Sequence, residues 1–171
     1  MAFRWVVFVF FLFLSGCLGI GRNGGIMGYH GGTVLTGTRK FSVSPLPSPW
    51  KSPKVRSKQL VHQNDEIGAT IVTDVLCGAK FDDAPLPRLG REMFQGLKEV
   101  TILREKEFTL EGSDAFRVTG KGTSQGVSIQ MDVVVMKKDF CLYDFAYFAP
   151  SSTFSKGVND FEGYFNGFRT Q

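Results

Sequence analysis

The chain has 171 residues, of which 43% are hydrophobic and 21% charged, and its formal net charge is +4 at pH 7. A chain of this length has room for one domain with a sizeable core, so no metal is needed to stabilise it. The positive charge is small and dispersed along the sequence, which argues against a nucleic-acid-binding protein.

The first sixteen residues have the organisation of a secretory signal peptide. Arg4 supplies positive charge ahead of an unbroken run of ten apolar residues, Trp5–Leu14. A run of this length suits the core of a signal peptide but is well short of the roughly 20 residues of a membrane-spanning helix. The segment ends in the sequence Leu-Ser-Gly-Cys, which closes with Cys17, and its small side chains would let a peptidase approach the backbone.

This ending resembles the lipobox of bacterial lipoproteins, Leu-(Ala/Ser)-(Gly/Ala)-Cys, at all four positions. The resemblance implies that Cys17 receives a diacylglyceryl group on its sulfur. It also implies that signal peptidase II cuts between Gly16 and Cys17 and that the new amine is then acylated. Two or three acyl chains on one residue make attachment to a bilayer effectively permanent. The alternative is an uncleaved membrane anchor that happens to contain a cysteine.

The lipobox resemblance also sets the expected location and partners. Leu18 is not the aspartate that typically retains lipoproteins in the inner membrane. We therefore expect an exported, lipid-anchored protein on the periplasmic face of the outer membrane in a Gram-negative organism. In any other organism we expect it on the outer face of the cytoplasmic membrane. The expected partners are the lipid bilayer, through lipidated Cys17, and an unidentified envelope protein, whereas export argues against nucleic acid.

A flexible tether is expected between the anchor and the folded domain, over residues 17–36. Residues 19–32 contain seven glycines in fourteen positions, a composition too flexible to bury a core. Three of these glycines spell Gly-x-Gly-x-x-Gly, but the preceding strand and following helix of a dinucleotide-binding site are missing. We interpret the motif as a consequence of glycine content and place a single domain at residues 37–171.

Past residue 60 the sequence predicts an antiparallel sheet of about five to six strands. Apolar and polar residues alternate in this part of the chain, as in strands with one buried face. Strands are predicted at 69–77, 101–110, 115–121, 127–135 and 141–148, with turns at 111–114 and 122–126.

Two helices are predicted to cover this sheet, which gives a sandwich-like α+β domain. The first has Pro87 in its first turn and an inner face of Leu89, Met93 and Leu97. The second follows Pro150, with Ser151 or Ser152 as its N-cap. Its apolar residues recur at helical spacing in one stripe: Phe154, Val158, Phe161, Phe165 and Phe168. We expect the stripe to pack on the sheet; a partner-binding helix is the alternative.

The order of these elements is similar to that of a known fold. Phe41-Ser-Val-x-Pro leads to Trp50, and a strand at 69–77, a helix, a meander of four strands and a closing aromatic helix follow. Over residues 37–169 this arrangement resembles the PsbP-like fold, typified by an extrinsic subunit of photosystem II. The resemblance implies a non-catalytic accessory domain that binds a larger partner. It carries over no functional residue, because one fold hosts many functions.

We find no catalytic or metal-binding motif. After Cys17 the chain has only His30 and His62, and it lacks His-Glu-x-x-His, Cys-x-x-Cys and Gly-x-Ser-x-Gly. Asp82 and Asp83 could act in acid–base chemistry, but their place before a predicted helix favours stabilisation of its N-terminus. We therefore expect no enzyme, no metal and no cofactor. A carrier of a small apolar ligand is the alternative function, and a hydrolase with an unrecognised site is the least favoured.

Cys77 and Cys141 remain as an even pair if Cys17 carries lipid. An exported protein meets an oxidising compartment, where such pairs form disulfides. Cys77 closes one predicted strand and Cys141 opens another, so the two meet if these strands are antiparallel neighbours. Two separate buried thiols, behaving as small apolar groups, are the alternative. The sequence leaves both open.

Overall fold

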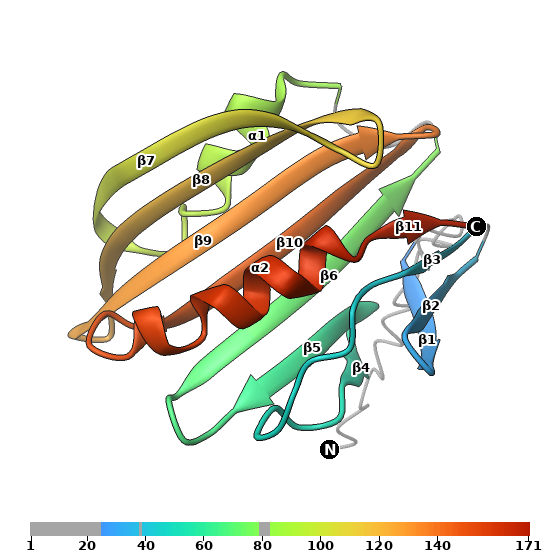
Figure 1. Ribbon diagram of the computed structural model, residues 1–171. Helices are drawn as coiled ribbons and strands as arrows, with labels where there is room; N and C mark the ends of the chain where they lie inside the picture. Colours follow the sequence, from blue (N-terminus) through green and yellow to red (C-terminus); the bar gives the residue numbers. More distant parts are fainter. Residues whose placement is uncertain (1–24, 38, 79–82) are drawn as a thin grey trace, which may run out of the picture.

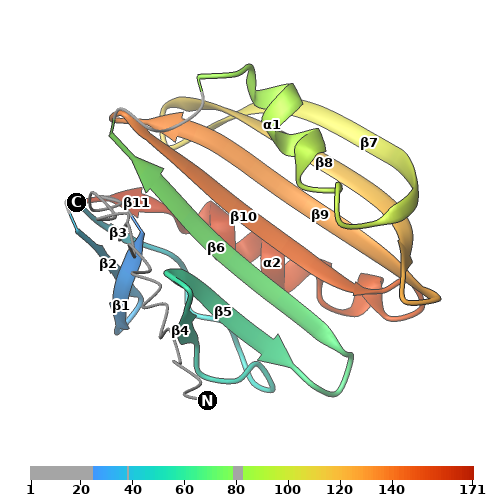
Figure 2. The same ribbon diagram turned by 180° about the vertical axis from the view of Figure 1, so that it is seen from behind.

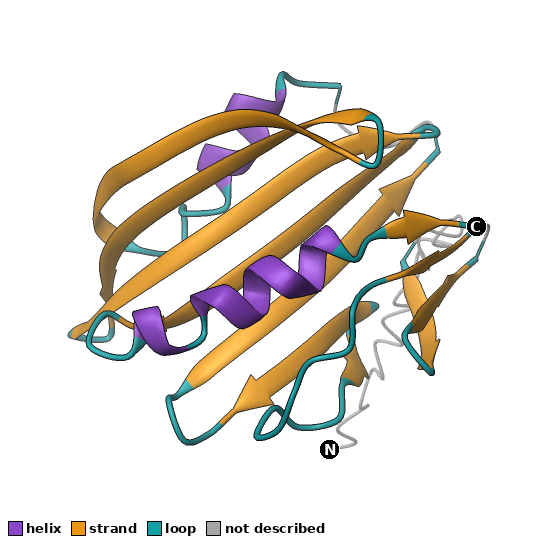
Figure 3. Cartoon of the chain, in the orientation of Figure 1, coloured by secondary structure: helices purple, strands orange, loops and turns teal. Residues whose placement is uncertain are grey.

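The computed structural model describes residues 25–37, 39–78 and 83–171. The expected signal peptide (1–16), Cys17 and Asp82 lie outside these residues. The described chain forms two antiparallel sheets and two α-helices, and strands dominate it (Figure 3). The fold is α+β, as the sequence predicts.

The larger sheet has seven antiparallel strands, and the two helices lie on its opposite faces (Figures 1 and 2). In hydrogen-bonded order the strands are β4 (Lys54–Arg56), β5 (Gln59–Asn64), β6 (Ala69–Cys77), β10 (Cys141–Pro150), β9 (Val127–Lys138), β8 (Ser113–Ser124) and β7 (Lys98–Leu110). The five predicted strands correspond to β6–β10, and β6 has the predicted bounds. The predicted number of strands is too low, because β4 and β5 extend the sheet beyond β6.

The smaller sheet has four strands, in the order β1 (Ile26–His30), β2 (Thr33–Thr36), β3 (Lys40–Ser42) and β11 (Arg169–Thr170). The expectation of a flexible tether over 17–36 therefore does not hold for residues 26–36. Ile26 and Val34 are buried in the main core, so this segment has apolar side chains that fix it. Gly31 and Gly32 take positive φ angles of 56° and 86° in the turn between β1 and β2. These glycines serve a tight hairpin rather than a flexible chain.

Helix α2 (Val158–Asn166) lies on the face of the larger sheet that is in front in Figure 1. Phe154, Phe161, Phe165 and Phe168 are all buried, and Val158 is partly buried against them. The predicted packing of this stripe on the sheet is confirmed, and the alternative of a partner-binding helix is not supported. The predicted N-cap is wrong. Residues 151–153 form a turn, the 3₁₀ helix η1 (Phe154–Lys156) follows, and Gly157 caps α2.

Helix α1 (Leu86–Glu92) lies on the other face, over β8 and β9 (Figure 2). Pro87 is in its first turn and Leu89 is buried, as predicted. Met93 is exposed, so the predicted inner face is wrong at this position. The helix ends before Met93, and Phe94 is buried in its place. The Phe94 ring lies against Gly120 of β8, where an added Cβ would come within 2.7 Å of it. Neither helix is long and apolar enough to span a membrane.

Strands β6 and β10 are antiparallel neighbours, with Cys77 directly opposite Cys141. The two residues are joined by a disulfide. Both side chains belong to the main core, on the same face of the sheet as α2. The disulfide thus links two central strands at the end where β9 turns into β10.

Candidate functional site

The most open part of the larger sheet is its outer strand β7. No described strand pairs with the outer edge of β7. Its residues 98–107 are all exposed, and they include the apolar side chains of Val100, Ile102 and Leu103. An edge strand of this kind presents unpaired backbone N–H and C=O groups to other chains. β7 is therefore a candidate binding surface.

Charged side chains of opposite sign lie on the two faces of β7. The register with β8 sets Lys106 opposite Arg117, whose side chain reaches α2, so Lys106 and Arg104 lie on the α2 face. Glu107 pairs with Phe116 on the α1 face, and Glu105 lies on that face too. Because side chains alternate along a strand, β7 is positive toward α2 and negative toward α1.

On the α2 face, a groove of about 380 Å³ separates β7 from η1 and α2. Phe154 and Val158 form an apolar part of its wall, and Arg104 and Lys106 line it from β7. Within the described part of the chain, neither of these two cations has a carboxylate partner. The groove thus offers apolar surface next to two unpaired positive charges.

A buried ion pair lies at the base of this groove. Arg117 donates from Nε and Nη2 to the carboxylate of Asp132 at 2.7–3.1 Å, and from Nη1 to Glu162 of α2 at 3.0 Å. Only 1% of Asp132 is exposed, and a charge so buried requires a partner of this kind. Burial opposes the charge on Arg117, but hydrogen bonds and attraction from Asp132 and Glu162 outweigh it and raise the pKa of the guanidinium. The charge of Arg117 is satisfied within the domain, which leaves Arg104 and Lys106 for a ligand.

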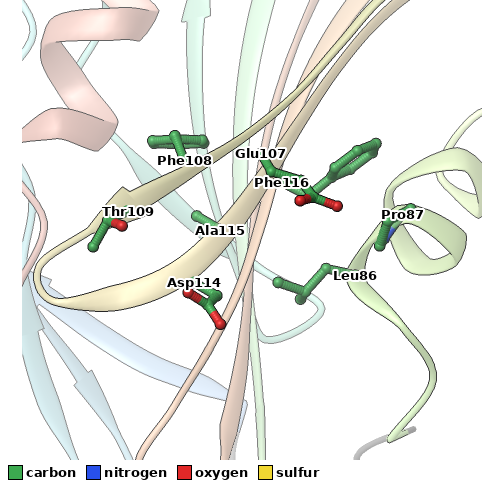
Figure 4. A pocket seen from close by; sticks show the side chains of 8 residues that line it. All are labelled: Leu86, Pro87, Glu107, Phe108, Thr109, Asp114, Ala115 and Phe116. Atoms are coloured by element: carbon green, nitrogen blue, oxygen red, sulfur yellow. The ribbon is translucent and has the colours of Figure 1, made fainter.

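The α1 face has a second groove, of about 450 Å³, where β7 and β8 meet the start of α1. Figure 4 shows Leu86 and Pro87 of α1 on one side of it and Glu107 and Phe116 on the strands. Its charged side chains are acidic, Glu107 and Asp114. The two grooves beside β7 therefore differ in the sign of their charge.

A third group of polar residues lies on the α1 face of β6 and β10. Asp74 and Asp144 are directly opposite each other in these strands. Burial, together with the negative charge of Asp74, raises the pKa of Asp144 to about 7. Its Oδ1 atom is buried and has no hydrogen-bond partner among the described residues, whereas Gln59 donates to Asp74 at 3.0 Å.

These carboxyl groups do not form a catalytic site with the described histidines. His62 lies opposite Ile71 and packs against Tyr164 of α2, on the face of the sheet opposite to Asp144. Burial lowers the pKa of His62 to about 4. Among the described residues, no three His, Cys, Asp or Glu side chains are placed to hold a metal ion. The described chain therefore shows neither a catalytic triad nor a metal centre.

None of the sequence-predicted site residues that the structure describes lines the β7 grooves. Cys17, the expected lipidation site, and Gly16 lie outside the described residues. Cys77 and Cys141 are bridged at the end of β6 and β10. Asp83 lies before Pro85, the N-cap of α1, so it is outside the first turn of the helix, and no side-chain hydrogen bond caps this end. Asp83 instead forms an ion pair with Lys137 of β9, at 2.9 Å.

Comparison with known proteins supports the fold. No protein-family model matches the sequence, and no curated protein does. LpqN of Mycobacterium tuberculosis, described as involved in cell envelope biogenesis, superposes with a TM-score of 0.57 at 14% identity, over 78% of this chain and 86% of LpqN. The cyanobacterial PsbP (CyanoP) of Synechocystis gives 0.52 at 11% identity, over 92% and 99%. A mutant of the protein Mog1 gives 0.54 at 13% identity, over 86% and 95%. The fold is PsbP-like. At these identities the likeness concerns the fold alone.

Proposed function

We propose that this chain is a membrane-anchored envelope lipoprotein whose PsbP-like domain is a non-catalytic accessory module that binds a protein partner. The lipobox-like ending at Cys17 supports the anchor. The fold shared with LpqN, a protein of cell envelope biogenesis, and with PsbP supports an accessory role in the envelope. The observation that carries partner binding is the open strand β7, with Arg104 and Lys106 unpaired beside a groove whose wall is partly apolar.

The chemistry of β7 points to an extended segment of the partner. Such a segment adds to the free edge through main-chain hydrogen bonds, and its alternate side chains enter the grooves on either face. On the α2 face it meets Arg104 and Lys106, so carboxylates are favoured at those positions. On the α1 face it meets Glu107, so basic residues are favoured there. The partner segment therefore alternates acidic residues, which face the α2 side of the sheet, with basic residues, which face the α1 side.

A second copy of this chain does not fit the same edge. Antiparallel pairing of two β7 strands about a two-fold axis keeps each face of the sheet continuous, so residues of one face oppose residues of the same face. A register centred on residue 105 then sets Arg104 against Lys106, and one centred on residue 106 sets Glu105 against Glu107. Like charges directly opposite each other destabilise a strand pair. The charge pattern of β7 thus disfavours self-association and favours a different protein.

The carrier alternative lacks a site in the described structure. The space between the sheet and α2 is filled by aromatic side chains, among them Tyr143, Phe145, Tyr147 and Phe161. The grooves described beside β7 are lined in part by charged residues. A carrier of an apolar ligand needs a predominantly apolar pocket. Partner binding is the function that these surfaces support best.

Site-specific crosslinking in the native cell tests partner binding. A photoreactive benzoylphenylalanine replaces Leu103, which is 49% exposed and lines the groove on the α2 face. The matched control carries it in place of Val55, which is 41% exposed on β4, the opposite edge strand. We expect an adduct from position 103 only, joined to a segment in which acidic and basic residues alternate. Its yield falls when Arg104→Glu and Lys106→Glu are combined. Equal adducts from both positions, or a yield unaffected by charge reversal, would contradict the proposed site.

The anchor has a separate test. Cys17→Ala removes the sulfur that would carry the lipid, so we expect loss of lipid labelling and accumulation of the uncut precursor. Cell fractionation and intact-protein mass spectrometry measure both effects. Cys77→Ala is the control, since it leaves the expected lipidation site intact. A Cys17→Ala chain that is still cut before residue 17 and still fractionates with membranes would disprove the lipoprotein anchor.

A further inference from the structure

The β9–β10 turn, the β2–β3 connection and the C-terminus lie at one end of the domain. Arg39, which follows β2, donates to the backbone carbonyl of Asp139 in the β9–β10 turn at 3.2 Å. The first strand of the described chain begins at this end too, because Ile26 pairs with Thr36 at the end of β2. Both ribbon views place the β9–β10 turn, the β2–β3 connection and the C-terminus at the same corner (Figures 1 and 2).

This corner bears the two most exposed large hydrophobic side chains of the described residues. Phe140 in the β9–β10 turn is 80% exposed, and Met27 of β1 is 72% exposed. Leu35 of β2 is exposed as well and lines a surface groove of about 560 Å³ together with Met27. Arg39 and Lys40 also line this groove, and Arg39 forms an ion pair with Asp139 of the neighbouring β9–β10 turn at 3.8 Å. We call Met27, Leu35, Arg39, Lys40 and Phe140 the tip.

Phe140 is an unusual residue for its position. Asp139 and Phe140 are the two central residues of the hairpin turn, and both have positive φ angles, 51° and 60°. Such turns strongly prefer Asn-Gly or Asp-Gly, because a bulky side chain is strained at positive φ. The chain thus holds a phenylalanine in an unfavourable conformation and leaves it in water. Departures of this kind from local sequence rules are expected at functional sites.

The expected lipid anchor enters the domain at the same corner. Cys17 precedes Ile26 by nine residues. Even a fully extended chain covers at most about 3.6 Å per residue, so the anchor holds the start of β1 within about 30 Å of the bilayer. The tip, at the corner where the described chain begins, is therefore within reach of the bilayer.

We propose that the tip is a membrane-docking surface, with the side chains of Phe140 and Met27 inserted among lipid headgroups. Aromatic side chains are enriched at membrane interfaces, and exposed cations are attracted to anionic lipids. Arg39 and Lys40 therefore face the headgroups in the docked state. Docking at this end directs the β8–β9 turn, at the other end of β9, away from the bilayer. This orientation rests on the proposed anchor at Cys17.

Tryptophan fluorescence of the full chain, produced in cells and reconstituted in vesicles, tests the docking. The vesicles contain phosphatidylcholine and phosphatidylglycerol with brominated acyl chains, which quench nearby indoles. Phe140→Trp reports on the tip. Val127→Trp is the matched control, since Val127 is 49% exposed beside the β8–β9 turn. The unmodified chain gives the background, which includes the buried Trp50.

We expect brominated lipid to reduce the emission of Phe140→Trp, with a blue shift, while the emission of Val127→Trp follows the background. Flotation of the vesicles reports separately on the anchor. A chain that floats but shows no extra quenching at position 140 overturns the docking and leaves the anchor standing. A chain that does not float overturns the anchor and the orientation with it. Equal quenching in vesicles of phosphatidylcholine alone supports insertion of Phe140 and overturns the role of Arg39 and Lys40.

Discussion

The two faces of the seven-stranded sheet are covered in different ways. The α2 face is closed by a continuous aromatic core, in which Phe161 stacks on Tyr147 at 5.8 Å and meets Phe165 at 5.1 Å. The α1 face has a smaller cluster beneath a seven-residue helix, and further along β6 and β10 it carries the carboxyl groups of Asp74 and Asp144. The α2 face holds most of the buried aromatic residues together with paired buried polar groups such as Asp132, whereas on the α1 face the buried Oδ1 of Asp144 has no hydrogen-bond partner among the described residues.

The sharpest test of this comparison removes one large side chain from each face. Phe161 is fully buried on the α2 face, and truncation of such a residue to alanine costs about 3–5 kcal/mol. We expect Phe161→Ala to lower the free energy of unfolding by this amount, a large share of the ~5–15 kcal/mol typical of a domain. Leu89→Ala on α1 is the corresponding variant on the other face, and we expect it to lower the free energy of unfolding by about 2 kcal/mol. Denaturant titration measures both, and equal losses would contradict the difference between the faces.

Some elements of the fold give strong signals in the sequence and others do not, for a physical reason. The phenylalanine stripe and the alternation in β6 are strong periodic signals, and both are borne out. Strand β5 gives no such signal, because two of its buried residues are the polar His62 and Asn64. The short strands β1–β4 and β11 are stabilised by pairing and by a few buried residues, which periodicity does not show.

The ion pair at the β7 groove depends on a turn length that the sequence does not determine. A turn over 122–126 would set residue 121 opposite 127 and place Arg117 and Asp132 on opposite faces of the sheet. The actual turn has two central residues, Gln125 and Gly126, and sets Thr119 opposite Asp132. Arg117 then lies diagonally across from Asp132, on the same face. A change of register by one residue moves every side chain of a strand to the other face of the sheet. A small error in the predicted turn therefore separates Arg117 from Asp132. A charged residue within the apolar strand β9 is the signal that could have located it.

The second test concerns the Cys77–Cys141 disulfide on the α2 face. It closes a loop with a sequence separation of 64 residues, and such crosslinks contribute about 2–4 kcal/mol, mainly by restricting the unfolded chain. We expect the double variant Cys77→Ala, Cys141→Ala to lose about that much free energy of unfolding. Mass spectrometry of exported protein alkylated without reductant provides the chemical check. A two-proton mass deficit with a crosslinked peptide is expected, whereas two alkylated thiols in folded protein would disprove the bridge.

The third test addresses the polar part of the α1 face through its dependence on pH. The pKa of Asp144 rises from 3.8 to about 7 on folding, chiefly through burial. Between these values the folded state holds more protons than the unfolded state, so this group makes stability fall as pH rises. The lowered pKa of His62, about 4 when folded against 6.5, acts in the opposite direction between pH 4 and 6.5. The two effects oppose each other in the wild-type chain.

The Asp144→Asn variant separates the contributions of Asp144 and His62 to the pH dependence, since it keeps the shape of the side chain and removes its charge. We expect the variant to be more stable than wild type by about 1–3 kcal/mol at pH 8, the usual cost of a buried unsatisfied polar group, with the gain vanishing near pH 4. Its own stability should then rise with pH from 4 to 6.5, in the direction that the lowered pKa of His62 dictates. Asp114→Asn, which changes an exposed carboxylate on β8, is the control and should leave the profile of the wild type unchanged. Denaturant midpoints from pH 4 to 8 measure the difference in stability between the variant and the wild type. A gain in stability that does not depend on pH would contradict the raised pKa of Asp144.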